Sequence, residues 1–198
     1  MFCLYCICFA IFAYLIGSIP TGYIAVKVKT DKDIRTIGSG STGATNVKRV
    51  LGKKWFFIVL LTDALKGAFP VIVAKLLTTD QYGIYAVICA IFVIIGHSKP
   101  IFLQFKGGKS VASGVGTILA LNIWVGLLIA LIWGTITYIS KYVSLGSIIA
   151  LAFAPVLMYL FKQPIGYVAY CTIAAIYIIY LHRQNIVRLI KGEENKVR

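Results

Sequence analysis

Charged side chains are scarce in this sequence, and acidic ones are scarcer still. Asp, Glu, Lys and Arg make up 13% of the 198 residues, about half of the roughly 25% that is usual in soluble domains. Six residues are acidic and 20 are Lys or Arg, so the formal net charge is +14. Hydrophobic residues make up 60% of the chain, and the mean hydropathy is +0.89. These values exclude a disordered chain, a coiled coil and an ordinary soluble enzyme.

Several common functional motifs are also missing. The sequence has no G-x-x-x-x-G-K-[ST] loop of the kind that binds nucleotides. It has no internal repeat, which argues against an inverted-repeat transporter. The five cysteines lie inside apolar runs without metal-ligand spacing, so we expect packing thiols and no metal site. They are Cys3, Cys6, Cys8, Cys89 and Cys171.

Long apolar runs fill most of the chain. A membrane-spanning helix needs about 20 apolar residues, so six or seven such helices leave no room for a separate soluble domain. The run 111–140 is too long for one untilted span, and we divide it at Asn122, a residue typical of turns. We therefore expect an all-α integral membrane protein, a single domain over 1–198 in which seven transmembrane helices form a bundle. The expected helices are 2–25, 55–77, 82–95, 110–121, 123–140, 143–161 and 165–181.

The basic residues predict an orientation. With seven spans, all Lys and Arg except Lys66, Lys75 and Lys162 fall on one side of the membrane. The positive-inside rule makes that side cytoplasmic, which places the N-terminus outside and the C-terminus in the cytoplasm. If 111–140 were one span, Lys141 and the basic tail would lie on the wrong side. In a soluble protein this basic excess would suggest nucleic acid, but between apolar runs it suggests anionic lipid or a phosphate-bearing substrate.

The first polar segment on the predicted cytoplasmic side, 38–49, reads GSGSTGATNVKR. Its glycines allow a tight curl in which successive N–H groups point at one anion. Its short polar side chains add donors, and Arg49 adds a planar fork suited to phosphate. The alternative is a flexible loop. The candidate ligands are Ser39, Ser41, Thr42, Thr45, Asn46 and Arg49.

The second polar segment runs from Gly96 to Ser113 and contains the run KGGK at 106–109, directly before an apolar helix. Two lysines and free N–H groups at a helix N-terminus favour anion binding. The alternative is an ordinary basic loop at a membrane surface. We expect His97 to be a structural hydrogen-bonding residue rather than a catalytic one.

The third polar segment, 182–194, places His182, Asn185 and Arg188 on one face if the last helix continues. An imidazole and an amide at this spacing could grip a polyol or steer a hydroxyl. The alternative is an interfacial helix end with basic side chains reaching for water. Asp63 and Lys66 lie inside an apolar helix, where charges are functional or paired, and we expect them to pair.

Together these segments resemble the bacterial acyl-phosphate:glycerol-3-phosphate acyltransferase (PlsY) family over essentially the whole chain. The family patterns are G-S-I-P-x-G-Y, G-S-G-[NS]-x-G-x-T-N-x-x-R, G-H-x-x-P-x-F-x-x-F-K-G-G-K and H-x-x-N-I-x-R-L-x-x-G-x-E. They stand here in order at Gly17–Tyr23, Gly38–Arg49, Gly96–Lys109 and His182–Glu194. Ser110 stands where Gly is frequent and Ser113 where Thr is common, and neither change removes a charge or a donor.

The resemblance implies a multi-pass enzyme of the bacterial inner membrane with its active site facing the cytoplasm. It would transfer a fatty acyl group from acyl phosphate to the 1-hydroxyl of sn-glycerol 3-phosphate, giving lysophosphatidic acid and inorganic phosphate. This is the first step of phospholipid biosynthesis, so functional coupling to an acyl-phosphate-producing enzyme would follow. We expect no cofactor, no metal and no nucleic-acid partner.

The resemblance also implies residue roles. Glycerol 3-phosphate would be held by Ser39, Arg49, Lys109, Ser147, His182 and Asn185, with Ser39, His182 and Asn185 as the catalytic candidates. Acyl phosphate would be held by Thr45, Asn46, Lys106, Gly107 and Gly108. Glu194 would be structural. The family's proposed mechanism gives the hydroxyl proton to a substrate phosphate, and our hypothesis is that His182 orients the hydroxyl more than it deprotonates it.

Two other classes of function compete with this interpretation. A phosphate or organic-anion transporter predicts polar residues through the middles of several helices, where this sequence has only Asp63 and Lys66. A non-enzymatic binder of anionic lipid needs basic clusters but not glycine-rich loops with placed His and Asn side chains. The acyltransferase interpretation accounts for both kinds of feature.

Overall fold

The computed structural model describes residues 2–79 and 83–196, and that part of the chain is helical without a β-strand. Five of its helical segments are long and apolar enough to cross a membrane, and the bent pair at the C-terminal end would make a sixth. Large hydrophobic side chains face outward along them; Leu76 and Ile165, for example, are 79% and 78% exposed. Because water would disfavour such a surface and lipid would not, the outer face is suited to a bilayer.

The first expected helix, 2–25, is two helices in the structure. Helix α1 (Phe2–Ser18) ends before Pro20, and α2 (Thr21–Thr30) continues after it. Proline has no N–H to donate and disfavours helical backbone at the residue before it, so the chain breaks here. After α2 come the 3-10 turn η1 (Ile34–Thr36) and the glycine-rich loop. Helix α3 (Ala44–Leu51) then begins directly after Gly43.

Three helices follow in the first half of the bundle. Helix α4 (Lys53–Leu77) begins two residues before the expected range. Helix α5 (Ile84–Ser98) continues three residues beyond the expected end, and its expected start at residue 82 lies outside the described residues. After the 3-10 turn η2 (Ile101–Leu103) comes α6 (Val111–Leu121). At 11 residues, α6 is about 16 Å long and can cross only about half of a bilayer core.

The second half of the bundle contains four helices. Asn122 ends α6, and its side chain caps α7 (Ile123–Ser140) by accepting from Val125 N at 3.0 Å. Helices α8 (Val143–Leu160) and α9 (Ile165–Leu181) follow. The short α10 (Arg183–Ile190) is bent by 60° from α9.

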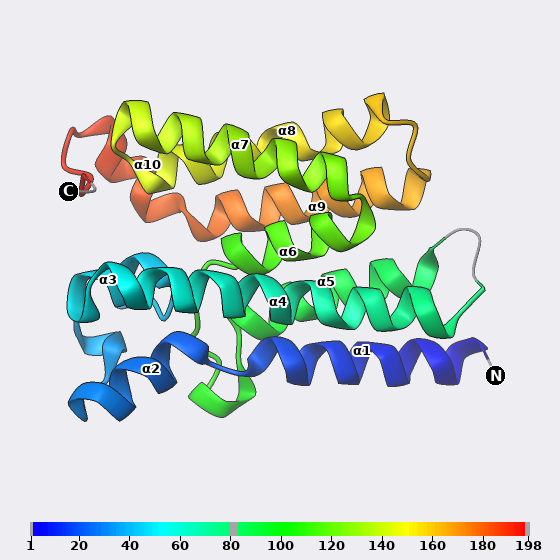
Figure 1. Cartoon of the computed structure of the whole chain (residues 1–198), viewed down its shortest axis with the longest axis horizontal. Coiled ribbons are helices and arrows are strands. Elements are labelled where there is room, and N and C mark those ends of the chain that lie inside the picture. Colours follow the sequence, from blue (N-terminus) through cyan, green and yellow to red (C-terminus); the bar gives the residue numbers. More distant parts are fainter. Residues whose placement is uncertain (1, 80–82, 197–198) are drawn as a thin grey trace.

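The helices form two groups joined by α6. Figure 1 shows α1, α4 and α5 on one side, α7, α8 and α9 on the other, and α6 between them. Gly116 of α6 lies so close to the carbonyl of Ala64 in α4 that a Cβ atom would collide with it. The N-terminus lies at one end of the long axis, while α2, α3, α10 and the C-terminus lie at the other (Figure 1).

Candidate active site

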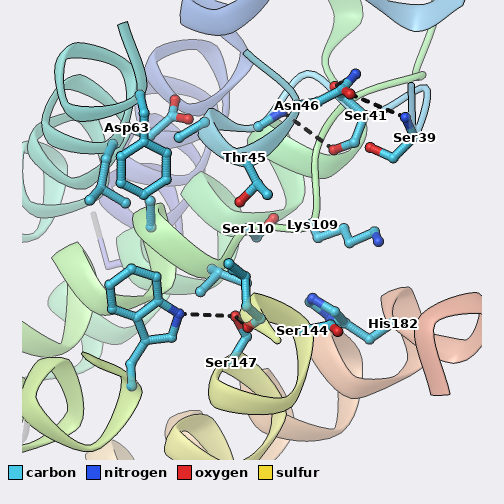
Figure 2. Close-up of a pocket in the computed structure, with 18 of the residues that line it drawn as sticks. Ser39, Ser41, Thr45, Asn46, Asp63, Lys109, Ser110, Ser144, Ser147 and His182 are labelled. Carbon is cyan, nitrogen blue, oxygen red and sulfur yellow. Dashed lines mark hydrogen bonds between the residues drawn. The ribbon is translucent and has the colours of Figure 1, made fainter. Parts of the chain in front are cut away.

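A cavity of about 510 Å³ opens at the end of the bundle where α3 and α10 lie. One part of its wall is polar and comes from the glycine-rich loop, the segment before α6, and the ends of α8 and α9 (Figure 2). The other part is apolar. The apolar lining residues of the cavity are Ala44, Phe56, Phe57, Leu60, Leu61, Ala64, Val111, Ala112, Val115, Ala130, Trp133 and Val143.

Asn46 holds the glycine-rich loop in shape. Its amide nitrogen lies within hydrogen-bond distance of the carbonyls of Ile37 (2.9 Å), Ser41 (3.0 Å) and Ile34 (3.3 Å). Its amide oxygen accepts from the backbone N–H of Ser39 at 3.1 Å, as Figure 2 shows. The donors and the acceptor of Asn46 are therefore engaged with the loop itself.

Around this loop, five of the six predicted residues line the cavity, and Thr42 does not. They are Ser39, Ser41, Thr45, Asn46 and Arg49. Thr45 lies in the first turn of α3, whose start at Gly43 and Ala44 also lines the cavity. The first N–H groups of a helix lack partners inside the helix and carry partial positive charge. This wall of the cavity therefore suits an anion.

Lys109 enters from the opposite side and meets Asn185. It directly precedes Ser110, the N-cap of α6, and its amine donates to Asn185 Oδ1. Burial, together with the positive charges of Arg188 and Arg49, lowers the pKa of Lys109 to about 8, against an opposing effect of Glu194. An amine with this pKa still carries its charge at neutral pH and is partly stripped of water.

Glu194 ties the end of the chain to this wall. Its Oε1 accepts from Asn185 Nδ2 at 2.7 Å and from Ser144 Oγ at 2.9 Å, and its Oε2 accepts from Arg188 Nε at 2.8 Å. Burial alone would raise the pKa of Glu194, but the hydrogen bonds from Asn185, Arg188 and Ser144 outweigh it and lower the pKa. Glu194 is thus an ionised anchor that fixes Asn185 between a carboxylate and Lys109.

His182 lies at the junction of α9 and α10 and is 3% exposed. Its Nδ1 lies 2.8 Å from the carbonyl of Ile178. Because a carbonyl can only accept, Nδ1 must carry the proton, which leaves Nε2 with a free lone pair. The ring lines the cavity and can accept a hydrogen bond from a hydroxyl there.

Ser147 of α8 closes the remaining side of the polar wall. Its hydroxyl donates to the carbonyl of Val143 at 2.8 Å and accepts from Trp133 Nε1 at 3.2 Å (Figure 2). Trp133 belongs to α7, so this contact joins two helices at the point where the polar and apolar walls meet. The sequence analysis missed Trp133, because no spacing pattern relates residues that meet only after two helices pack.

The structure does not bring every predicted residue to the cavity. Lys106, Gly107 and Gly108 are absent from its lining, and Lys106 is exposed. The N–H of Gly107 donates to Ser98 O at 3.2 Å and that of Gly108 to His97 O at 3.1 Å. These N–H groups are already satisfied, so a role for this run in binding acyl phosphate stays a prediction.

Two further buried residues line the cavity. Asp63 and His97 both reach it, and Asp63 pairs with Lys66. The sequence analysis had marked all three without placing any of them at the site. Among residues 2–79 and 83–196, no three His, Cys, Asp or Glu side chains are grouped so that they could hold a metal ion.

Known proteins are similar to this chain in sequence. Residues 7–192 match the family model described as glycerol-3-phosphate acyltransferase. The glycerol-3-phosphate acyltransferase of Desulforamulus reducens is 45% identical over 185 residues, which cover 93% of this chain and 92% of that protein. The one from Staphylococcus haemolyticus is 44% identical over 196 residues, covering 95% and 96%.

Solved structures are similar to this chain in fold. The crystal structure of PlsY, an integral membrane glycerol 3-phosphate acyltransferase, in its glycerol 3-phosphate form superposes with a TM-score of 0.92 at 38% identity. The match covers 98% of this chain and 96% of that one. Its lysophosphatidic acid form superposes with a TM-score of 0.89. This chain therefore belongs to the PlsY family of glycerol-3-phosphate acyltransferases.

Proposed function

We propose that the protein transfers a fatty acyl group from acyl phosphate to the 1-hydroxyl of sn-glycerol 3-phosphate, releasing lysophosphatidic acid and inorganic phosphate. The observation that carries the proposal is that one cavity joins a cationic polar wall to an apolar wall at the lipid-facing surface. Phe57 and Leu61 of α4 line the cavity and are 64% and 60% exposed on the outside of the bundle. An acyl chain can therefore lie against lipid while its phosphate end reaches Thr45 at the start of α3.

In the proposed site, each substrate phosphate has its own donors. Arg49, Lys109 and Ser39 bind the phosphate of glycerol 3-phosphate, since a guanidinium fork and an ammonium suit a phosphate dianion. Thr45 and the N-terminus of α3 bind the phosphate of the acyl donor. A crystal structure of PlsY in a glycerol 3-phosphate form supports binding of that acceptor by this fold.

The proposed chemistry needs no covalent enzyme intermediate. The acceptor hydroxyl attacks the acyl carbon, an ester C–O bond forms, and the C–O bond to phosphate breaks. The hydroxyl proton leaves on a substrate phosphate, and the phosphate released carries away the electron pair of the broken bond. His182 Nε2 accepts a hydrogen bond from the hydroxyl and aims it, while Asn185, held by Glu194, orients the glycerol backbone.

The same proposal covers orientation and place. Seven helices lie in the bacterial inner membrane, of which the short α6 crosses only part of it, with the N-terminus outside and the cavity facing the cytoplasm. The support is that the N-terminus and the cavity lie at opposite ends of the bundle (Figure 1), and that α2, α3 and α10, which carry basic residues, lie at the same end as the cavity. Acyl phosphate then arrives from an enzyme that makes it.

The donor is tested with purified protein in lipid vesicles and labelled glycerol 3-phosphate. We expect labelled lysophosphatidic acid from palmitoyl phosphate and none from palmitoyl-coenzyme A. The variant Arg49→Gln replaces the charged guanidinium with a neutral amide. It should lose most of the activity. Product formed from palmitoyl-coenzyme A alone would contradict the proposed donor.

A further inference from the structure

A buried ion pair fastens α4 to the break between α1 and α2. Asp63 and Lys66 are 1% and 9% exposed, and Lys66 Nζ lies 2.9 Å from Asp63 Oδ1. Lys66 also donates to the carbonyl of Ile19 at 2.7 Å, and Asp63 accepts from Thr21 Oγ1 at 2.6 Å. These contacts alone would give the pair a structural role.

Asp63 has a neighbour that this structural role does not require. The Nδ1 atom of His97, near the end of α5, lies 3.6 Å from Asp63 Oδ1 and forms no hydrogen bond within the described part of the chain. His97 is 6% exposed. Asp63 and His97 both line the active-site cavity, whereas Lys66 does not. The carboxylate therefore faces an imidazole on the side toward the substrates.

His97 in turn supports the backbone that leads to Lys109. Its carbonyl accepts from Gly108 N at 3.1 Å, and its ring lies so close that a Cβ atom on Gly108 would collide with Nε2. The adjacent bond from Gly107 N to Ser98 O closes the same loop at 3.2 Å. The imidazole is thus held between the carboxylate of Asp63 and the residue that directly precedes Lys109.

We propose that Asp63 is a positioning residue, which acts through His97 and Gly108 to place the Lys109 amine in the cavity. The inference rests on the role proposed above for Lys109 as a ligand of the glycerol 3-phosphate phosphate. A misplacement of about 1 Å can cost on the order of 100-fold in activity. Small movements of the ring therefore change the affinity for glycerol 3-phosphate, although Asp63 itself touches no substrate.

The test compares Asp63→Asn with Lys66→Gln in vesicle-reconstituted protein. Each variant breaks the same ion pair, but only Asp63→Asn changes the group that faces His97. We expect Asp63→Asn to raise KM for glycerol 3-phosphate about tenfold, because it weakens one charged hydrogen bond, that from Lys109 to the phosphate. KM for acyl phosphate should stay unchanged. In Lys66→Gln both KM values should stay unchanged. An equal rise of KM in the two variants would show a general structural defect and overturn the proposal.

Two more variants keep the test decisive if Asp63→Asn does not fold. His97→Gln removes the ring and leaves the ion pair in place, and it should raise KM for glycerol 3-phosphate in the same way. Lys109→Met tests the ligand role itself, and an unchanged KM there contradicts that role and this inference together. A raised KM in Lys109→Met with an unchanged KM in His97→Gln overturns the positioning role alone.

Discussion

Among single residues, Lys109 connects the most parts of the site. It comes from the segment between α5 and α6, yet its amine binds Asn185 of α10. Glu194 holds Asn185 from the other side at 2.7 Å. A cation held by an amide oxygen rather than by a carboxylate keeps most of its charge for a ligand. Lys109 therefore suits a phosphate that must bind and later leave.

The lowered pKa of Lys109 predicts a pH dependence. The free enzyme loses this charge as the pH rises through about 8, so kcat/KM for glycerol 3-phosphate should fall above that pH. Initial rates measured from about pH 6 to about pH 10 test this. Lys109→Arg stays charged throughout, so its profile should lose the fall near pH 8. A wild-type profile that stays flat to about pH 10 would contradict the ligand role of Lys109.

His182 allows a separate prediction about proton transfer. Its Nδ1 donates to Ile178 O, so only Nε2 can face the substrate. If His182 orients the hydroxyl, His182→Gln should keep much of kcat, with a loss of about tenfold, because an amide oxygen can still accept the bond. Loss of a general base costs on the order of 10²–10⁴-fold. A loss of that size that high pH restores would contradict the orienting role.

Residue chemistry in the sequence predicts the kind of ligand better than it predicts individual contacts. The glycines and short donors of 38–49 indicate phosphate, and Ser39, Thr45 and Arg49 do line the cavity. Asn46, expected to bind acyl phosphate, also lines the cavity, and that role stays a prediction. Its bonds to Ile34 and Ile37 could not be predicted, because they depend on the path of the folded loop. The role of Gly107 and Gly108 stays a prediction, and their N–H bonds could not be predicted because only folding brings the accepting segment beside them.

At the scale of elements, the site depends on helices that end inside the bundle. Helix α6 is only 11 residues long, so its N-terminus and Lys109 lie at the cavity rather than at a far membrane surface. The 60° bend after α9 turns α10 across the same opening. Two interrupted elements therefore bring His182, Asn185 and Lys109 together.

The segment after α10 is expected to be essential through Glu194. In Glu194→Gln, one carboxylate oxygen becomes an N–H donor, so the bonds from Asn185, Arg188 and Ser144 cannot all form. The buried carboxylate accepts three bonds, and we expect a loss of about 2 kcal/mol of stability and most of the activity. Glu193→Gln changes an exposed neighbour and is the matched control. Thermal unfolding in detergent measures both, and equal midpoints would contradict the anchoring role.

Hydropathy predicts where the apolar helices lie but not where they bend. The break at Pro20 falls inside an apolar run and does not change the average hydropathy that predicts a helix. The end of α6 at Asn122 also falls inside such a run, and it was expected from the length of the run and the turn preference of Asn122, not from hydropathy. The bend after α9 was missed for a different reason. The expected continuation that puts His182 and Asn185 on one face is compatible with either a straight or a bent helix.

For the whole molecule, the arrangement predicts access to two phases. The polar wall of the cavity lies at the end of the bundle near α3 and α10, and the apolar wall reaches the outer surface at Phe57 and Leu61. A charged, water-soluble acceptor and a lipid-like donor can thus enter from different directions. The all-helical membrane fold could be predicted from composition alone, but this shared cavity depends on how seven helices, α3 to α8 and α10, pack.

The proposed topology predicts which loops a membrane-impermeant thiol reagent can reach. In a cysteine-free background, Lys162→Cys lies between α8 and α9 and should react in intact cells. Lys32→Cys lies after α2, and it should react only once the membrane is opened. Both positions are exposed, so burial cannot explain a difference between them. Labelling of Lys32→Cys in intact cells would contradict an N-terminus outside.

The most direct test of the central claim is release of inorganic phosphate by purified, lipid-reconstituted protein given palmitoyl phosphate. If both substrates meet in one cavity, release should require glycerol 3-phosphate and should match the lysophosphatidic acid formed, one for one. Ser39→Ala, made in the glycine-rich loop, should lower both products together. Phosphate release that is independent of glycerol 3-phosphate, or no release from folded protein, would contradict acyl transfer at this site.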